Sequence, residues 1–316
     1  MRRHLVSSIE ELPALHPASV VTVGVFDGLH LGHLSILQRL ARASTERELP
    51  SVCVTFSVHP KAVLKGTSPR HILSLEHRLD LLARQGVDDV VVIGFSREFA
   101  QVEPETFVEE LLVRRLGVTE LVIGHDTAIG KDRRGDAAFL ATAGRRYGFR
   151  VVAVGGVTVN GEVVSSTAVR RAIATGDLPA AERLLGRPVS LLGTVVKGDG
   201  RGATLGFPTA NLEVHSEAFP PLGVYAVTAR CALGDLPAVM NYGLRPTFKQ
   251  DETHAVFEVH VLDGDDLQLY GERMEVFVHE QLRKEQRFDG PEQLKAQIAR
   301  DCEAARGVPR HVPPTG

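Results

Sequence analysis

The chain has 316 residues, enough for two domains that each bury a core of their own. Its formal net charge of −3 gives no basic field of the kind that binds nucleic acid. Its 43% hydrophobic residues are ordinary for a globular protein. The three cysteines, Cys53, Cys231 and Cys302, form no CxxC pair. Their spacing excludes the usual zinc and thioredoxin motifs and fits a reducing compartment.

The N-terminus gives no sign of export. Arg2 and Arg3 could begin a signal peptide, but Glu10 and Glu11 interrupt the apolar segment that such a peptide needs. The longest apolar runs, such as 90–93, have the length of strands rather than of membrane-spanning helices. We therefore expect a cytoplasmic protein with neither a membrane nor a nucleic-acid partner. The sequence leaves open whether the chain forms homo-oligomers.

The first half of the chain alternates β-branched runs with helical patterns. Strands are expected at 20–25, 51–56, 90–94, 120–124 and 150–154, and helices at 32–43, 75–85, 106–116 and 137–147. This alternation predicts a parallel sheet covered on both faces. Right-handed crossovers then make the fold doubly wound.

The segment from Gly24 to His33, GVFDGLHLGH, joins the first of these strands to its helix. A helix start exposes main-chain N–H groups and the positive end of the helix dipole, both of which attract phosphate. Gly28 and Gly32 allow the backbone or a ligand to approach closely. His30 and His33 are three residues apart and share one face of a helical turn. Both imidazoles can therefore donate hydrogen bonds to a polyphosphate and to the charge that develops as pyrophosphate leaves.

HxGH in this position resembles the signature of the nucleotidyltransferase superfamily, whose members attack the α-phosphorus of a nucleoside triphosphate. The segment 164–170, VSSTAVR, resembles the second motif of that superfamily, ISSTxIR. Its hydroxyls suit the cap of a following helix, and Arg170 would meet phosphate from the first turns of that helix. The glycine-containing segment 124–132 is not a P-loop. Its glycines are one residue too far apart, and Asp132 stands where Ser or Thr would bind Mg²⁺.

Beyond about residue 186 the pattern changes to an alternation of apolar and polar residues. Strands are expected at 189–196, 224–229, 236–242, 254–261 and 274–282, and one helix at 291–305. Period-two alternation is typical of a half-buried antiparallel sheet. Short strands with Gly and Pro between them and one terminal helix predict a small β-barrel. We therefore predict an α/β domain at 1–186, an all-β domain at 187–306 and a frayed tail at 307–316.

A second candidate site lies near the start of the all-β domain. It runs from GTVVKGDGRG at 193–202 to LGFPTANL at 205–212. The glycines allow a loop to wrap closely around phosphates. Thr209 and Asn211 are two residues apart, so in an extended segment their side chains point to one face, and their oxygens are hard ligands suited to Mg²⁺. A simple Gly/Pro turn between strands has the same composition.

The whole chain resembles the bacterial bifunctional riboflavin kinase/FAD synthetase family. The motifs that carry the resemblance occur in the family's order: GVFDGxHxGH, SSTxxR, LGFPTANL, RPTF at 245–248, FEVH at 257–260, LYG at 269–271 and LRKEQRF at 282–288. The match runs from about residue 20 to 305. The resemblance implies a doubly wound nucleotidyltransferase domain followed by a small antiparallel Greek-key β-barrel with a C-terminal helix. It also implies phosphorylation of riboflavin to FMN and adenylylation of FMN to FAD, with ATP and Mg²⁺ in both steps.

The resemblance also implies roles for individual residues. In the kinase half, Thr209 and Asn211 would hold Mg²⁺–ATP, and Glu258 would be the general base on the riboflavin 5′-hydroxyl. In the adenylyltransferase half, His30, His33 and Arg170 would stabilise the leaving pyrophosphate, and no base is needed because the FMN phosphate is already an oxyanion. ATP and its phosphates would meet Gly24, Phe26, Asp27, Gly28, Gly32, Ser165, Ser166, Thr167, Gly198, Gly206, Pro208, Thr209 and Asn211. The flavin would meet Phe56, His59, Asp126 and Arg245.

The chain departs from the family pattern in a few places. The loop 124–136 commonly reads GxDFRFGxxRxGD, and Thr127 and Ile129 replace both of its aromatic residues. Lost stacking surface would weaken the binding of FMN there. Val58 stands where the family often has Pro, and Ala203 stands where a basic residue is common.

Two other functions fit parts of the sequence. HxGH domains also transfer nucleotides to other phosphates, but the PTAN segment argues against this, because the FMN made by one half is the substrate of the other. A flavin- or nucleotide-binding regulator with one inactive site is supported by the altered loop alone. The presence of His30, His33, Thr209, Asn211 and Glu258 opposes it, since a sensor would not need the whole set.

Overall fold

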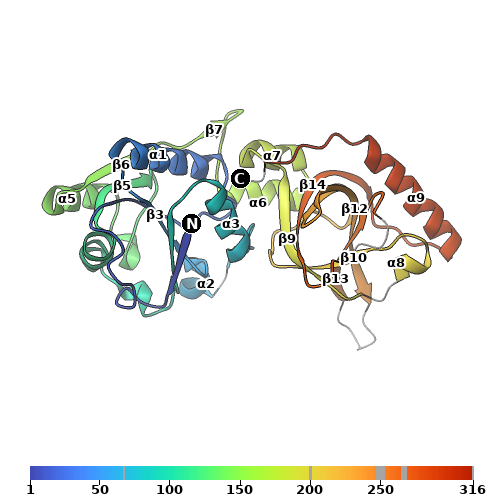
Figure 1. Ribbon diagram of the computed structural model, residues 1–316, viewed down its shortest axis with the longest axis horizontal. Coiled ribbons are helices and arrows are strands. Elements are labelled where there is room, and N and C mark those ends of the chain that lie inside the picture. Colours follow the sequence, from blue (N-terminus) through green and yellow to red (C-terminus); the bar gives the residue numbers. More distant parts are fainter. Residues whose placement is uncertain (67, 199–200, 247–252, 265–268, 315–316) are drawn as a thin grey trace. The chain divides into compact units, whose positions relative to one another are not determined.

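The structure is a computed structural model, and it describes residues 1–66, 68–198, 201–246, 253–264 and 269–314 (Figure 1). Contacts divide the chain into two units. The first unit contains Met1–His71 and Leu75–Ser166, and the second unit contains Ile72–Ser74 and Thr167–Pro314. Helices α6 (Ser166–Thr175) and α7 (Leu178–Leu185) therefore group mainly with the second unit. The domain boundary at residue 186 stays a prediction from the sequence.

The first unit is built on a parallel sheet. Its strands are β1 (Arg2–Val6), β2 (Ser19–Val23), β3 (Ser51–Phe56), β4 (Asp89–Ile93), β5 (Val118–Gly124) and β6 (Arg150–Val154). They are ordered β1-β4-β3-β2-β5-β6, and each neighbouring pair is parallel. Every residue of β2 and β4 is buried, as expected for strands covered on both faces. The doubly wound parallel sheet is confirmed, and the edge strand β1 was missed because its sequence, RRHLV, lacks an apolar run.

The helices of the first unit follow the expected alternation. They are α1 (Leu31–Arg47), α2 (Pro60–Lys65), α3 (Leu75–Arg84), η1 (Phe99–Gln101), α4 (Pro104–Thr106), η2 (Phe107–Arg115), η3 (Lys131–Arg133) and α5 (Ala137–Tyr147), with a small hairpin of β7 (Thr158–Val159) and β8 (Glu162–Val163). The helix predicted at 106–116 is the wider π-helical η2, which directly follows the short α4. Asp136 caps α5 by accepting a hydrogen bond from the Phe139 N–H at 2.9 Å. Within the described parts of the chain, none of the helices combines the length and apolar composition that a membrane span needs.

The strand order places a ligand-binding position within the sheet. From β2, the chain builds β3 and β4 on one side and later adds β5 and β6 on the other side. In such sheets ligands bind beyond the carboxyl ends of the strands, at the point where the winding reverses. Here that point lies between β2 and β5. The segments that follow these two strands are the HxGH turn and the loop 124–136.

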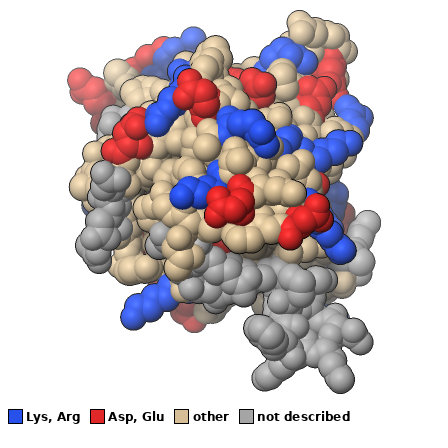
Figure 2. All heavy atoms as spheres, turned by 90° about the vertical axis from the view of Figure 1, so that its right-hand side faces the viewer, with Lys and Arg blue, Asp and Glu red and all other residues tan. Residues whose placement is uncertain are grey.

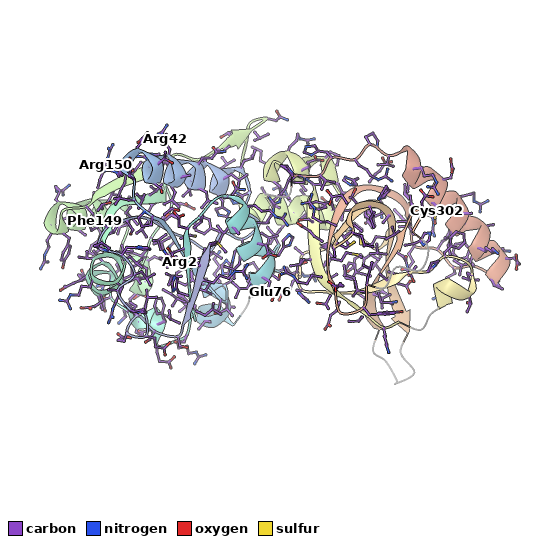
Figure 3. All side chains as sticks on the ribbon, in the orientation of Figure 1. Arg2, Arg42, Glu76, Phe149, Arg150 and Cys302 are labelled. Carbon is purple, nitrogen blue, oxygen red and sulfur yellow. The ribbon has the colours of Figure 1, made fainter. Side chains whose placement is uncertain are left out.

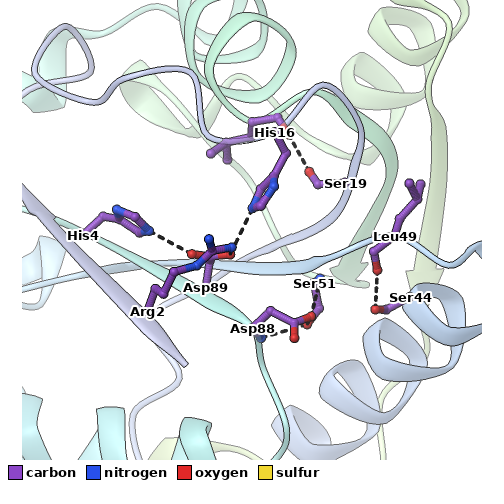
Figure 4. Close-up of polar contacts among 10 residues, drawn as sticks. Arg2, His4, His16, Ser19, Ser44, Leu49, Ser51, Asp88 and Asp89 are labelled. Atoms are coloured by element: carbon purple, nitrogen blue, oxygen red, sulfur yellow. Dashed lines mark hydrogen bonds and ion pairs between the residues drawn. The ribbon is translucent and has the colours of Figure 1, made fainter.

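At the opposite, amino end of the sheet, charged side chains are paired. The buried carboxylate of Asp89 accepts hydrogen bonds from Arg2 at 2.7 Å, His4 at 2.8 Å and His16 at 2.9 Å (Figure 4). Burial alone would raise the pKa of Asp89, but the hydrogen bonds from these three side chains bring the pKa below its usual value. This cluster ties the edge strand β1 and the segment before β2 to β4.

The second unit is a closed antiparallel barrel. Its elements after α7 are β9 (Val189–Val196), α8 (Arg201–Thr204), β10 (Ala210–Val214), β11 (Gly223–Cys231), β12 (Gly234–Pro246), β13 (Thr253–Val261), β14 (Arg273–Lys284) and α9 (Pro291–Gly307). The strands close in the order β10-β13-β12-β11-β14-β9. Strands β11 to β13 pair in sequence and β14 returns to lie beside β11, which is the Greek-key arrangement. The predicted barrel and C-terminal helix are confirmed, and only the short β10 was missed among the barrel strands described.

Helix α9 packs on the outside of the barrel, against β11 and β12 (Figure 1). Cys302, labelled in Figure 3, is buried in a hydrophobic cluster with Ala226 and Val239 of these two strands. Beyond α9, the Pro313 carbonyl accepts a hydrogen bond from Arg230 at 2.5 Å, so this part of the tail that we expected to fray has a contact with the barrel. On the face of the second unit seen in Figure 2, basic and acidic side chains are interspersed among the residues drawn in colour.

Candidate active sites

The HxGH turn has an unusual backbone. Between the end of β2 and the start of α1, Phe26 has φ 53°, Gly28 has φ 87° and Leu29 has φ 38°. Positive φ is easy for glycine but strained for Phe and Leu, and such strain persists only where the surroundings enforce it. Phe26 and Leu29 are each about 1% exposed, so the core holds both side chains. The turn therefore brings its polar residues to the helix start in a fixed conformation.

The two histidines of the motif meet at the N-terminus of α1. His30 is the N-cap residue, and its Nδ1 accepts a hydrogen bond from the His33 N–H at 3.3 Å. The imidazole rings stack with centroids 3.7 Å apart at 14°, and the edge of Phe26 approaches His33 at 5.3 Å. A Cβ atom added at Gly32 would lie 3.2 Å from the His30 ring, so a larger residue there would crowd it. The expected shared face of His30 and His33 is present, at the positive end of the helix dipole.

The SST motif contacts the same turn through its second serine. The Ser166 hydroxyl donates a hydrogen bond to the Asp27 carbonyl at 2.8 Å. Ser166 therefore holds the turn in addition to starting α6. Thr167 and Arg170 lie on α6, in the second of the two contact units, so their contacts with phosphate stay predictions.

Aromatic and polar residues follow β3 at the same edge of the sheet. Phe56 ends β3 and makes an edge-to-face contact with Phe95 at 5.4 Å. His59 caps α2, where its Nδ1 accepts a hydrogen bond from the Lys61 N–H at 3.1 Å. Two of the residues predicted to meet the flavin thus lie at the carboxyl end of β3 (Phe56) and just beyond it (His59), beside β2 in the sheet.

The two substitutions in the loop after β5 have different consequences. Ile129 is 7% exposed and belongs to the hydrophobic core with Phe107, so it packs inward. Thr127 lies over the end of β5, because a Cβ atom added at Gly124 would be 3.4 Å from its hydroxyl and 3.3 Å from a carboxylate oxygen of Asp126. We expected lost stacking surface at both positions. In this loop conformation the buried Ile129 presents no open surface for a flavin, so the expected loss concentrates at Thr127.

Residues beneath this edge are shielded from water. Cys53 of β3 is fully buried, and burial raises the pKa of its thiol to about 12. Since the thiolate is the reactive form of cysteine, Cys53 is an inert core residue at neutral pH. The polar chemistry of the first unit therefore rests on the turn and loop residues above it.

In the barrel, strand register aligns three polar residues. Glu258 of β13 is paired with Asn211 of β10 on one side and with Asn241 of β12 on the other. The Asn241 side-chain amide donates a hydrogen bond to a Glu258 carboxylate oxygen at 3.2 Å. Two of the predicted kinase residues, Asn211 and Glu258, are thus direct cross-strand neighbours. Asn241 was not predicted, because its pairing with Glu258 depends on the register of β12 and β13, which sequence patterning does not set.

Two glycines that precede the PTAN segment, Gly198 and Gly202, lie directly against it. A Cβ atom added at Gly198 would collide with the Asn211 amide, and one added at Gly202 would lie 3.0 Å from the Thr209 hydroxyl. The glycines thus allow the loop to lie directly against both predicted Mg²⁺ ligands. The Nδ1 of His260 donates a hydrogen bond to the Pro208 carbonyl at 2.8 Å, which ties β13 to the start of the motif.

Some predicted positions carry less information. Gly206 has φ 87° in the turn before Phe207, a conformation that glycine adopts without steric strain. Arg245 lies on β12. Asp199, Gly200 and the end of the RPTF motif at 247–248 lie outside the described residues.

Comparisons with known proteins agree with the fold. The sequence model of the FAD synthetase family matches residues 12–168, and that of the riboflavin kinase family matches residues 185–308. A nucleotidyltransferase-type sheet followed by a flavokinase-type barrel defines a two-domain transferase. The chain belongs to the bifunctional riboflavin kinase/FMN adenylyltransferase family.

The similarity extends over nearly the whole chain. The Escherichia coli K12 bifunctional riboflavin kinase/FMN adenylyltransferase is 41% identical over 290 residues, which are 91% of each chain. The Pseudomonas fluorescens protein of the same description is 40% identical and covers 96% of this chain and 97% of its own. A solved structure from Streptococcus pneumoniae, titled a macrolide-efflux protein, superposes with a TM-score of 0.83 at 31% identity, over 97% of this chain and 99% of that one.

Proposed function

We propose that the first unit transfers the adenylyl group of ATP to FMN, and that the barrel transfers the γ-phosphoryl group of ATP to riboflavin. The observation that carries this proposal is the geometry of two separate groups of polar residues in one chain. A stacked His30–His33 pair stands at a helix start, and a Glu258 carboxylate stands beside Asn211 of the PTAN segment. The product of the second site is the phosphate substrate of the first, which accounts for their occurrence together.

The adenylyl transfer depends on alignment and charge stabilisation. An FMN phosphate oxygen forms a bond to the α-phosphorus of ATP, the bond from that phosphorus to the bridging oxygen breaks, and pyrophosphate leaves with the electron pair. We propose that His30 and His33 donate N–H groups to the phosphates, together with the positive end of α1. Arg170 and the Ser165–Thr167 hydroxyls would add donors. Phe56, His59 and Asp126 would border the flavin.

The kinase reaction needs a base. The riboflavin 5′-hydroxyl gives its proton to the Glu258 carboxylate while its oxygen attacks the γ-phosphorus, and ADP leaves. The hydrogen bond from Asn241 holds one oxygen of that carboxylate in place. We propose that Gly198, Gly206 and Pro208 lie along the ATP phosphates and that Arg245 contributes to riboflavin binding.

The residues of the PTAN segment are compatible with Mg²⁺. A hydroxyl at Thr209 and an amide oxygen at Asn211, with the Glu258 carboxylate one strand away, form a set of hard oxygen donors. When bound with ATP, Mg²⁺ supplies charge neutralisation between the phosphates. The protein's part is to present Thr209 and Asn211 on one short stretch of chain and to place Gly198 and Gly202 directly against them.

We propose that the protein works in the cytoplasm on small-molecule substrates, without a nucleic-acid or membrane partner. The three cysteines support a reducing compartment, since all are free. The assembly state is left to measurement.

A time course tests the proposed function. Purified protein is incubated with riboflavin, ATP and Mg²⁺, and the flavins are separated at intervals. FMN that appears first and is followed by FAD supports both activities. FMN alone restricts the proposal to the barrel and points to Thr127 as the cause. Binding of flavin and ATP by a unit that forms no product, while the other unit stays active, supports the regulator with one inactive site.

A further inference from the structure

A buried arginine lies behind the HxGH turn. Arg78 of α3 is 2% exposed, and it is the largest fully buried side chain among the described residues. Its Nη1 donates a hydrogen bond to the Val25 carbonyl at 2.8 Å, and its Nη2 donates to the Phe56 carbonyl at 2.5 Å. Val25 directly precedes the strained Phe26, and Phe56 ends β3. One rigid guanidinium therefore links the HxGH turn to the segment that leads to His59.

Burial of the Arg78 side chain costs free energy that its hydrogen bonds do not fully offset. Burial lowers the pKa of Arg78, and the charge of Asp27 opposes that effect. Burying a cation is costly unless it is fully paired, yet the hydrogen bonds from Nη1 and Nη2 go to neutral carbonyls, and the Nε has no hydrogen-bond partner within the described residues. An apolar side chain of similar length would fill the same volume. A feature that breaks the rules for a stable core in this way is expected where function requires it.

The carbonyls that Arg78 holds belong to a strained turn with other supports. The Thr55 hydroxyl of β3 also donates to the Val25 carbonyl, at 3.3 Å, and the Ser166 hydroxyl donates to the Asp27 carbonyl at 2.8 Å. Donors from α3, from β3 and from the start of α6 thus converge on two adjacent parts of the turn. Thr55 also links β3 to the turn, but Arg78 differs from it because one guanidinium donates to the main chain of the turn and to the last residue of β3 at the same time.

We infer that Arg78 is a positioning residue for adenylyl transfer. By fixing Val25 relative to Phe56, it sets the distance between the histidines that meet ATP and the segment that borders FMN. The inference rests on the proposed function of the first unit. Loss of this link would leave both substrates able to bind, but out of line for attack. Misplacement of reacting groups by about 1 Å lowers a rate about 100-fold.

The test compares three variants in two assays on the full chain. Arg78→Met removes both hydrogen bonds and the charge. Arg78→Lys keeps the charge but has one terminal nitrogen in place of the two that donate to Val25 and Phe56. Arg42→Met is the control. Arg42 lies on the outer side of α1 with 67% of its side chain exposed (Figure 3). Steady-state kinetics of FAD formation from FMN and ATP give kcat and both KM values. Riboflavin phosphorylation by the same samples reports on the barrel.

We expect Arg78→Met to lower the kcat of FAD formation about 100-fold with KM values changed less than about threefold. The kcat of FAD formation by Arg78→Lys should be about tenfold higher than that of Arg78→Met. Riboflavin phosphorylation should be unchanged in all variants, and Arg42→Met should form FAD at the wild-type rate. A folded Arg78→Met protein with a kcat within threefold of wild type overturns the inference. So does a loss confined to KM.

Two further outcomes are also decisive. If Arg78→Met does not fold, Arg78→Lys carries the test: a kcat lowered at least fivefold with wild-type thermal stability supports the inference, and a wild-type kcat overturns it. If the wild-type protein makes no FAD, the proposed function fails. If the wild-type protein makes FAD and the Arg78 variants make it at the wild-type rate, only the inference fails, so the two failures are distinguishable.

Discussion

The HxGH turn and the PTAN strand place their polar side chains by different means. In the first unit, the backbone itself is unusual, with positive φ at Phe26, Gly28 and Leu29, and the histidines follow from that turn. In the barrel, Asn211, Glu258 and Asn241 sit on regular strands and meet because the register pairs them. The site in the first unit depends on the backbone conformation of a turn, and the site in the barrel depends on the register that aligns side chains on neighbouring strands.

This difference indicates how each site should respond to substitution. A turn-built site is sensitive to any change that alters its backbone, including changes at residues that touch no substrate. A register-built site keeps its backbone when a side chain is replaced, because cross-strand hydrogen bonds hold the strands. Substitutions in the barrel should therefore act through the chemistry of the group removed.

The largest effect is expected from removing both histidines. His30→Ala combined with His33→Ala takes away the imidazole donors at the start of α1, and we expect FAD formation to fall by about 10³-fold or more. FMN formation from riboflavin should persist, because Glu258 and Asn211 are untouched. Separation of the flavins after incubation with ATP measures both in one sample. Equal loss of the two activities would show that the sites are not independent.

A smaller effect, of opposite selectivity, is expected from Glu258→Gln. The amide keeps the size of the side chain but cannot accept the proton of the riboflavin hydroxyl, so FMN formation should fall about 10²–10³-fold. FAD formation from supplied FMN should be unchanged. Glu303→Gln on α9, where the side chain is 82% exposed, is the matched control. A Glu258→Gln protein that phosphorylates riboflavin at the wild-type rate would exclude this residue as the base.

Backbone sensitivity can be tested with a pair of glycines. Gly28→Ala places a Cβ at φ 87°, which costs about 1–2 kcal/mol and favours a relaxed turn. We expect the kcat of FAD formation to fall roughly tenfold, since about 1.4 kcal/mol corresponds to a factor of ten. Gly161→Ala, at φ 81° in the β7–β8 turn with open space around it, carries a similar strain and should leave the kcat unchanged. Equal effects of the two would contradict a turn-built site.

Most of the fold could be predicted from the sequence because its signals are local. The strands β3 and β6 and the helix α5 have the predicted limits, since apolar runs and caps define them. The strand β1 escaped prediction because it is a polar edge strand that its partner β4 stabilises. The short β10 was missed because it follows a Gly/Pro segment, yet it carries Asn211.

The candidate sites were predictable where residues lie close in sequence. HxGH and PTAN each fall within four residues, so spacing brings their side chains together. Arg78 and Asn241 could not be found in this way. Arg78 lies 53 residues from Val25 and acts on main-chain carbonyls, which leave no trace in the side-chain pattern. Asn241 reaches Glu258 only through the barrel register.

The smallest effect on catalysis is expected at the amino edge of the first unit's sheet, where Asp89 accepts hydrogen bonds from Arg2, His4 and His16, with Asp88 as its neighbour (Figure 4). Asp89→Asn should cost about 2 kcal/mol of stability at pH 7, or roughly 4–8 °C in Tm, with kcat values within twofold. Because the folded pKa of Asp89 is lowered, its contribution is fully present above its unfolded pKa of about 3.9 and is lost as the pH falls through the lower folded value. The difference in Tm between wild type and variant should therefore be steady from pH 7 to about pH 5 and should shrink below about pH 4. A variant that lost FAD formation while keeping its Tm would contradict this expectation. It would show that the amino edge of the sheet affects catalysis at the carboxyl edge.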